Sequence, residues 1–245
     1  MKRRNLLAGM AAVFTAGCTK IGETEWFGGV VKQAEDLHRV AQRGLARPDM
    51  APQFTRADIS PFFRGNGSLE VDTDAYRASA AGGFADWTLT VGGLVETPLV
   101  LTLEQLRTLP QRTQITRHNC VEGWSAIAEW TGPQLATILD LATVAPNARY
   151  IVLRCADELK GARYYESIDM DDALHPQTII AHALNGAPLP VLNGAPLRLR
   201  VERQLGYKHA KYLTGIELVA SLDSVEGGKG GYWEDRAGYQ WYAGI

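Results

Sequence analysis

The segment "RHNCVEGW", residues 117–124, gathers the most informative side chains of the chain. It places a thiol, Cys120, two residues after His118 and two residues before Glu122. If residues 115–120 form a strand, His118 and Cys120 point to the same face, where the imidazole could lower the thiol pKa and make a nucleophile. The thiol could also be a buried filler, half of a disulfide, or a ligand to a bound metal.

The composition is that of a soluble globular protein with no global charge signal. The 245 residues are 46% hydrophobic, and 25 basic residues against 27 acidic ones give a formal net charge of -2. Nothing in this balance indicates a nucleic acid or an anionic membrane surface as a partner. Any anion-binding site must therefore be local.

The N-terminus differs from the rest of the chain, because residues 1–18 have a basic start, an apolar run and small residues before Cys18. This pattern predicts an export signal. The pair Arg3-Arg4 is typical of twin-arginine export, which carries folded proteins to the periplasm. The sequence "TAGC" indicates a lipoprotein cleavage site, with Cys18 as a lipid anchor. The alternative is ordinary signal cleavage, with Cys18 removed or left inert.

Once Cys18 is assigned to the signal, Cys120 and Cys155 are the remaining cysteines. An oxidising compartment would permit a disulfide between them. However, Cys155 lies in the apolar strand-like run "YIVLRCA", and Cys120 follows the short polar run "ITRHN". Neither thiol has the loop setting of a small disulfide-stapled domain, so the pattern disfavours a bridge.

Residues 19–53 predict a mostly polar helical arm, and residues 54–245 predict one α+β domain dominated by strands. Residues 86–102 indicate a hairpin that turns at Gly92-Gly93. The Gly-rich and aromatic tail, residues 227–245, predicts an irregular segment packed over the core rather than a phosphate-binding loop.

Two short helices and two turns complete the expected elements. Residues 101–110 predict a helix capped by Thr102 with Glu104 nearby, and residues 131–144 predict a second helix with Pro133 in its first turn. The repeated "LNGAPL", at residues 184–189 and 192–197, predicts two tight Asn-Gly turns flanking one short strand.

The metal chemistry open to Cys120 is limited by its isolation in the sequence. No second Cys or His lies at zinc-ligand spacing, and no CxxC, HExxH or CxxCH motif is present. A single thiolate suits a transition metal whose other ligands belong to an organic cofactor. Such a cofactor would carry a phosphate, and basic residues that could bind it follow one another late in the chain: Arg198, Arg200, Arg203, Lys208, His209 and Lys211.

Three blocks together resemble the sulfite oxidase superfamily of molybdopterin-dependent oxidoreductases. They are "FFRGNG" at residues 62–67, "RHNCVEGWSAIAEWTG" at 117–132 and "NGAPLRLRVERQLGYKHAKY" at 193–212. The resemblance is closest to the exported bacterial branch that contains the catalytic subunit of the periplasmic methionine sulfoxide reductase. It implies a strand-rich molybdopterin-binding domain with molybdenum-molybdopterin as cofactor.

The resemblance also implies the site residues. Cys120 is the expected metal ligand, and Cys120, Arg64 and Glu122 are the expected catalytic positions, with Glu122 and Trp124 shaping the surroundings of the metal. The expected cofactor-binding residues are Phe63, Arg64, Cys120, Cys155, Asn193, Arg198, His209, Ala210 and Lys211. Ser60 stands where that branch has an Asn, so the sequence leaves its role open.

Two departures from sulfite oxidases shape the expected activity. Those enzymes follow the metal cysteine with Ala-Gly-Asn-Arg, whereas this chain has Val121 to Trp124, and the Glu122 carboxylate would repel sulfite. The chain also ends where those enzymes add a dimerisation domain, so the expectation is a monomer without one. The expected reaction is reduction of an uncharged S-oxide or N-oxide, with electrons from a membrane-bound partner such as a cytochrome b.

Three alternatives remain open at this point. The first is a sulfite-oxidising enzyme, and the second is a cysteine-dependent hydrolase or transferase that uses Cys120 with His118. The third is a non-catalytic exported binding lipoprotein.

Overall fold

The structure, a computed structural model, describes residues 50–245 throughout and the isolated positions 26, 33, 34, 37, 39–41 and 44 before them. Those earlier positions are helical. The predicted export signal, with Arg3-Arg4 and Cys18, lies outside the described residues. The chain divides into two units, Met1–Asp49 and Met50–Ile245, and the second unit holds every predicted site residue except Cys18.

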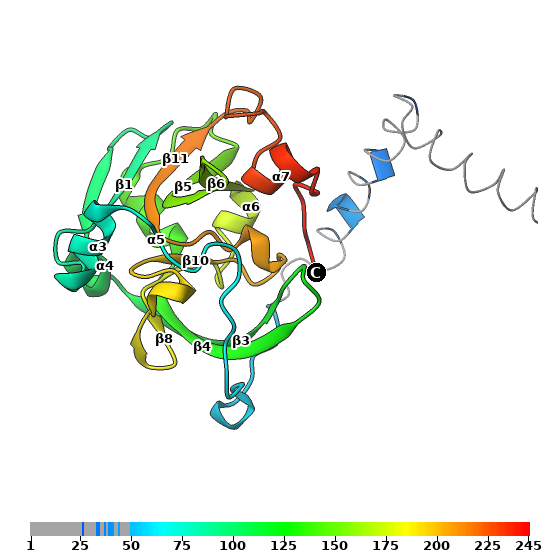
Figure 1. Cartoon of the computed structure of the whole chain (residues 1–245). Helices are drawn as coiled ribbons and strands as arrows, with labels where there is room; N and C mark the ends of the chain where they lie inside the picture. Colours follow the sequence, from blue (N-terminus) through cyan, green and yellow to red (C-terminus); the bar gives the residue numbers. More distant parts are fainter. Residues whose placement is uncertain (1–25, 27–32, 35–36, 38, 42–43, 45–49) are drawn as a thin grey trace, which may run out of the picture. The chain divides into compact units, whose positions relative to one another are not determined.

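The larger unit is built on a five-stranded sheet (Figure 1). Its strand order is β2 (Leu99–Thr102), β1 (Thr88–Gly93), β11 (Leu213–Val219), β5 (Tyr150–Leu159) and β6 (Ala162–Asp169). β1 runs parallel to β11, and the other pairs are antiparallel. Strand β5 is covered on both faces, because its consecutive residues Ile151, Val152 and Leu153 are all fully buried. This burial explains the unbroken apolar run in its sequence.

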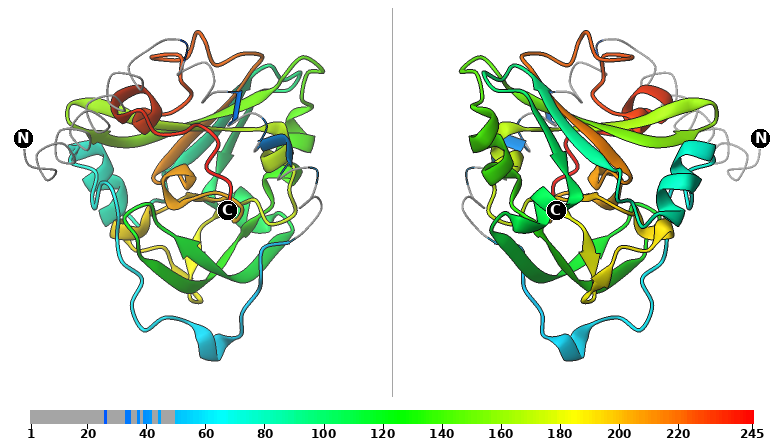
Figure 2. Two further views of the ribbon diagram at one scale, coloured as in Figure 1. Left: turned by 90° about the vertical axis from the view of Figure 1, so that its right-hand side faces the viewer. Right: turned by 90° about the vertical axis from the view of Figure 1, so that its left-hand side faces the viewer.

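A second, four-stranded sheet follows the order β3 (Gln111–Asn119), β4 (Ser125–Pro133), β8 (Ala183–Leu184) and β9 (Ala187–Pro188). The long β3–β4 hairpin curves across the domain on the side away from the five-stranded sheet, as Figures 1 and 2 show.

The short pair β7 (Ile179–Ala181) and β10 (Arg198–Arg200) packs against β4 of this second sheet. A side chain at Gly132 would lie 2.0 Å from the Ile180 carbonyl, so glycine permits the close approach of β7 to β4.

Short helices cover the edges of the sheets. They are α3 (Asp74–Ala81), α4 (Leu103–Thr108), α5 (Leu135–Ala142), α6 (Met170–Ala173) and α7 (Tyr232–Ala237), with 3₁₀ turns η1 (Arg56–Asp58), η2 (Val191–Asn193) and η3 (Gly206–Lys208). The predicted cap of α4 is confirmed: Thr102 Oγ1 accepts the Gln105 N–H at 3.2 Å, and Gln105 Oε1 accepts the Thr102 N–H at 2.9 Å. Among the described residues, no helix has the length and apolar character needed to cross a membrane.

The predicted α+β class and the β1–β2 hairpin are confirmed, but two local predictions were wrong. Gly92 and Gly93 do not form the turn, because they remain in β1 and pair with Glu217 and Leu218 of β11. A Cβ at Gly93 would lie 2.3 Å from the Leu218 carbonyl, so close strand approach explains this glycine. Pro133 ends β4 instead of lying in the first turn of α5.

Both predicted Asn-Gly turns form. Asn185 and Gly186 connect β8 to β9 with φ of 51° and 78°, as a tight hairpin requires. Gly194 ends η2 with φ of 106°, and a Cβ there would lie 2.9 Å from Cβ of Lys211. The second turn therefore brings the chain directly against a predicted site residue.

The C-terminal tail packs over the core as expected. The Leu205 N–H donates to the Ala243 carbonyl at 2.9 Å, and the Ile245 N–H donates to the Arg203 carbonyl at 3.0 Å. Within the tail, Trp233 and Tyr239 stack with ring centroids 5.6 Å apart. These two aromatic rings form part of the wall of a cavity.

Candidate functional site

Cys120 lies one residue beyond the end of β3, in the tight connection to β4. Its N–H donates to the Trp124 carbonyl at 2.9 Å, and its carbonyl accepts the Gly123 N–H at 3.0 Å. Gly123 has φ of 85°, a conformation that favours glycine. The turn presents the thiol inward, where 7% of the residue is exposed and Asn66 Nδ2 lies 3.9 Å from Sγ.

The thiol faces a cavity of about 290 Å³ between the two sheets' loops and the C-terminal tail. The loop after residue 62, the β3–β4 turn, β5, β6, η3 and α7 all contribute to its wall. The lining residues are Asn66, Gly67, Ser68, Cys120, Val121, Glu122, Asp157, Leu159, Tyr164, Gly206, Tyr207, His209, Lys211, Trp233 and Tyr239. Four of the predicted site residues, Cys120, Glu122, His209 and Lys211, therefore share one cavity.

Burial raises the pKa of Cys120 above its usual value. The backbone N–H of Glu122 lowers this pKa and the Glu122 carboxylate raises it, while Arg198 and Asn66 lower it. The free thiol is therefore protonated at neutral pH. A metal ion would displace this proton, because a thiol that coordinates a metal does so as the thiolate.

His118 does not activate Cys120. It is 1% exposed, and its Nδ1 accepts a hydrogen bond from Arg200 Nη1 at 2.9 Å, so Nε2 carries the imidazole proton. Burial, followed by the charges of His209 and Arg200, holds the pKa of His118 well below its usual value. No hydrogen bond joins His118 to Cys120 among the described residues. The nucleophile pair of the hydrolase alternative is thus not formed.

Arg198 is a buried cation with unused donors. It is fully buried, and its Nη1 donates to the Asn193 carbonyl at 3.2 Å, whereas Nε and Nη2 have no partner among the described residues. Its guanidinium lies 5.3 Å from the ring centre of Trp130 and 5.9 Å from that of Phe63. Burial and the neighbouring Arg200 lower the pKa of Arg198 to about 9.

Lys211 and His209 follow this cation later in the chain, and the charge of Arg198 acts on both. Lys211 Nζ donates to the carbonyls of Asn66 at 2.7 Å, Leu192 at 3.3 Å and Ser68, with no carboxylate among these acceptors. Burial and the charge of Arg198 lower the pKa of Lys211 to about 7. His209 Nε2 donates to the Gln204 carbonyl at 3.1 Å, and its Nδ1 has no partner within the described part of the chain.

The remaining predicted cofactor residues lie behind or beside the cavity. Phe63 is buried against His118, Trp124 and Trp130. Arg64 is exposed, and its guanidinium lies 5.9 Å from the Trp124 ring.

Ala210, a predicted cofactor residue, and Ser60, whose role the sequence leaves open, are each hydrogen-bonded to a strand. Ala210 is buried and uses its carbonyl to accept the Leu199 N–H. Ser60 Oγ accepts the Ile127 N–H at 2.9 Å and ties the loop to β4.

Cys155 lies on β5 and is 2% exposed. It is not joined to Cys120 by a disulfide. Burial, and then the Asp157 carboxylate, raise the pKa of Cys155 well above its usual value. Its role beside the cofactor stays a prediction, as do those of the other residues carried over by position.

Glu122 and Trp124 form a polar pair at the cavity edge. Trp124 Nε1 donates to Glu122 Oε2 at 2.8 Å, which holds the carboxylate of an otherwise exposed side chain in place. Because Glu122 lines the same cavity as Cys120, any substrate that reaches the thiol passes near a negative charge.

The buried polar atoms without partners show whether the site fits a phosphate-bearing metal cofactor. The buried donors without a partner among the described residues are Arg198 Nε and Nη2, Asn193 Nδ2 and His118 Nε2. Buried donors beside a buried cation suit an anion, because each unmade hydrogen bond costs about 1–3 kcal/mol. Within the described residues no three His, Cys, Asp or Glu side chains form a metal cluster. A single soft thiolate beside an anion pocket fits molybdopterin.

Sequence reasoning missed several cavity residues. Asn66 lies inside the quoted block "FFRGNG", and Asp157 stands two residues after Cys155 on the same strand, so strand periodicity could have indicated it. Trp233 and Tyr239 gave no such signal, because their approach to Cys120 depends on how the tail folds back.

The fold and the cavity around Cys120 are those of a cofactor-binding oxidoreductase domain of the sulfite oxidase type. Over residues 78–224 the chain matches the family model described as "Oxidoreductase molybdopterin binding domain", and it belongs to that family. The resemblance seen in the sequence is thereby confirmed, and the cofactor class is molybdenum-molybdopterin.

Relatives and a solved structure agree with this assignment. The chain is 44% identical over 160 residues to a protein of Azospira oryzae named "Putative protein-methionine-sulfoxide reductase subunit YedZ1", covering 65% of this chain and 56% of that protein. It is 35% identical over 161 residues to the protein-methionine-sulfoxide reductase catalytic subunit MsrP of Xanthomonas axonopodis pv. citri, covering 61% of this chain and 50% of the relative. The chain thus spans about half the length of these curated relatives.

The crystal structure of the sulfane dehydrogenase SoxCD from Paracoccus pantotrophus has a similar fold. Its TM-score is 0.53 at 24% identity, and the match covers 57% of this chain and 40% of that chain. This likeness supports the fold.

Proposed function

We propose that this protein reduces an uncharged S-oxide or N-oxide, with methionine sulfoxide as the first candidate substrate. The observation that carries the proposal is the Cys120 thiol in a cavity that Glu122 also lines. The relatives named as methionine-sulfoxide reductases support the same substrate class. The reaction would be R₂SO + 2 H⁺ + 2 e⁻ → R₂S + H₂O.

The chain supplies the setting for this reaction. When bound, the molybdenum centre supplies two-electron oxygen-atom transfer. Cys120 would contribute its thiolate ligand, while the unused donors of Arg198 and Asn193 would hold the phosphate of the pterin. Trp233 and Tyr239 would cover the cavity from the side of the tail and limit access of water.

Charge favours a neutral substrate over sulfite. Two like charges 4 Å apart repel by about 4 kcal/mol near a protein surface, so an anion near Glu122 would bind weakly. Sulfite oxidation remains the second candidate, and Glu122→Gln separates the two. For a sulfoxide reductase, the change should leave the KM for a neutral sulfoxide nearly unchanged.

The test of the proposed function is Cys120→Ser in protein loaded with molybdopterin. Serine oxygen is a harder ligand than sulfur, so methionine sulfoxide reduction with a reduced dye as electron donor should be lost. Cys18→Ser is the matched control, because it makes the same exchange at a thiol with no predicted place in the cofactor site, and it should remain active. Full turnover by Cys120→Ser, or a wild type that oxidises sulfite and reduces no sulfoxide, contradicts the proposal.

We also propose export to the periplasm and attachment to the membrane through Cys18. Arg3-Arg4 and the segment before Cys18 support this proposal. Replacing Arg3-Arg4 with Lys-Lys should leave the protein in the cytoplasm, and Cys18→Ala should release exported protein from the membrane fraction. Unchanged fractionation of both variants would contradict the proposal.

The electrons would come from a membrane-bound one-electron donor such as a cytochrome b. The word "subunit" in the names of the relatives supports a protein partner for this chain. Detergent-solubilised membranes from the native host should yield a haem-containing protein bound to a tagged form of this chain. Turnover with reduced dye but none with membranes and quinol would contradict this partner.

A further inference from the structure

Asp157 is a buried carboxyl in the wall of the cavity, on β5. It is 2% exposed, and its Oδ2 accepts a hydrogen bond from the Ser68 hydroxyl. Its Oδ1 is buried and has no partner in the described part of the chain. Because Asp157 and Cys120 line the same cavity, the Asp157 side chain lies next to the space that the cofactor would occupy.

Asn66 provides a second unsatisfied acceptor in the same wall. Its Oδ1 is buried without a partner among the described residues, while its Nδ2 lies 3.9 Å from Sγ of Cys120. Lys211 Nζ binds the backbone carbonyl of Asn66 at 2.7 Å and the carbonyl of Ser68. Lys211 therefore holds in place the loop that carries both Asn66 and Ser68, whose hydroxyl donates to Asp157.

The unsatisfied atoms of the site thus form two groups of opposite character. Arg198 and Asn193 present donors without acceptors, whereas Asp157 and Asn66 present acceptors without donors. A ligand that satisfies both groups carries an anion and also N–H groups. A pterin has N–H donors on its aminopyrimidine ring in addition to the phosphate of its side chain.

We infer that Asp157 and Asn66 form an acceptor subsite for the ring N–H groups of the pterin, separate from the phosphate subsite. A carboxylate can accept two parallel N–H bonds, as it does from arginine. A bound cofactor is permanent, so it would satisfy a buried oxygen continuously. A substrate would leave that oxygen without a partner between turnovers. The inference rests on the cofactor of the family and is independent of which oxide is reduced.

The charged groups around Asp157 are compatible with this role. Burial raises the pKa of Asp157, while the Ser68 hydroxyl and the Lys211 ammonium lower it. N–H donors from a ligand would also favour the ionised carboxylate.

The experiment compares Asp157→Asn with Asp86→Asn. In Asp157→Asn the amide oxygen can still accept the Ser68 hydrogen bond, but the new NH₂ group then faces the N–H donors of the ligand. Asp86 is the matched control, because it also accepts a serine hydroxyl, from Ser79, but is exposed and lies outside this cavity. Both variants are produced in a host that makes molybdopterin.

The readout is molybdenum and pterin per mole of purified protein. We expect Asp157→Asn to bind the cofactor about tenfold less tightly and to be loaded substoichiometrically, while Asp86→Asn matches wild type. Thermal unfolding gives a second measurement: the difference in Tm between loaded and cofactor-free protein should shrink for Asp157→Asn only. A Tm of cofactor-free Asp157→Asn close to wild type shows that the variant folds.

Two results would overturn the inference. One is a wild-type cofactor content and an unchanged Tm difference in Asp157→Asn. The other is a wild-type content with a raised KM for methionine sulfoxide, which would assign the acceptors to the substrate. A wild-type protein that binds molybdopterin but reduces no sulfoxide would contradict the proposed function and leave this inference standing.

Discussion

Arg198 and Arg200 lie two residues apart on β10, are equally buried, and both lie over the ring of Trp130, yet their hydrogen bonds differ. Arg200 donates to both carboxylate oxygens of Glu202, at 2.9 and 2.6 Å, and to His118. Arg198 has one backbone acceptor and two unused donor atoms within the part of the chain that the structure describes. Arg200 is thus paired by side chains of the protein, whereas Arg198 keeps donors that a ligand could use.

The two buried lysines nearby show the same contrast. Lys208 Nζ binds Glu166 and Glu234, at 2.5 and 2.9 Å. Burial alone would lower the pKa of Lys208, but these two carboxylates raise it. Among the described residues Lys211 has only carbonyl acceptors, and its pKa falls to about 7. Burial alone therefore does not identify a binding residue, whereas unused hydrogen-bonding capacity does.

The largest expected effect comes from Glu202→Leu, which removes the carboxylate partner of Arg200. The change leaves the Arg200 guanidinium buried without its carboxylate, which should lower the free energy of unfolding of the cofactor-free protein by about 3–5 kcal/mol. Denaturant titration measures this loss. The double variant Arg200→Met with Glu202→Leu should recover much of the lost stability. If Glu202→Leu alone is as stable as wild type, the contrast between Arg200 and Arg198 does not hold.

Arg198→Met should not lower the stability of the cofactor-free protein, in contrast to Glu202→Leu. Removing a buried cation with unused donors should leave the cofactor-free protein at least as stable as wild type. Loss of phosphate contacts should weaken cofactor binding by about 1–3 kcal/mol and lower the ratio of molybdenum to protein. If the metal ratio is unchanged, the phosphate site is misplaced.

Lys211→Met tests the lowered pKa of Lys211 through the pH dependence of the free energy of unfolding. Because the pKa of Lys211 is about 7 in the folded protein and higher when unfolded, the unfolded state binds the extra proton above pH 7. Wild-type cofactor-free protein should therefore gain stability relative to the variant by about 1 kcal/mol per pH unit from pH 7 toward pH 9. A difference that stays constant between pH 6 and pH 9 would contradict the lowered pKa.

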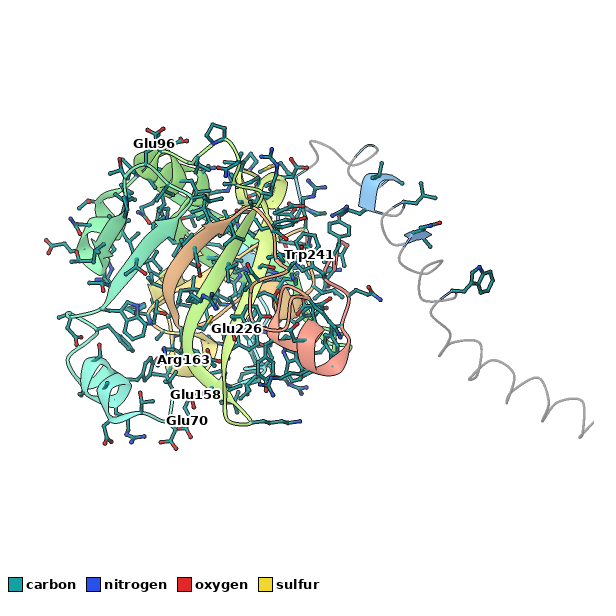
Figure 3. All side chains as sticks on the ribbon, turned by 90° about the horizontal axis from the view of Figure 1, so that it is seen from above. Glu70, Glu96, Glu158, Arg163, Glu226 and Trp241 are labelled. Carbon is teal, nitrogen blue, oxygen red and sulfur yellow. The ribbon has the colours of Figure 1, made fainter. Side chains whose placement is uncertain are left out.

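The smallest effect should come from an ion pair on the surface. Figure 3 places Glu158 and Arg163 along the β5–β6 hairpin, and Arg163 Nε lies 3.9 Å from Glu158 Oε1 with 75% of its side chain exposed. Arg163→Ala should change the free energy of unfolding by less than about 1 kcal/mol, and added salt should reduce this change further, because salt screens exposed charges. A larger loss would show that exposed pairs also carry stability here.

Local signals in the sequence predicted much of this protein. Thr102 and Gln105 cap α4 through contacts three residues apart, and the Asn185-Gly186 turn needs only positive φ at adjacent positions. Steric and hydrogen-bonding preferences at such short range are written into the chain itself. The three blocks at residues 62–67, 117–132 and 193–212 likewise predicted the family through their order and spacing.

The sequence by itself thus determined the α+β class, the single thiolate and the need for an anion pocket. Only the tertiary structure decided that Gly93 serves the β1–β11 contact, since its neighbour Leu218 is distant in the chain. It also distinguished Arg198 from Arg200, which are equivalent in "RLR". The partners that satisfy one and not the other come from distant elements, and a hydrogen bond depends on where those elements meet in space.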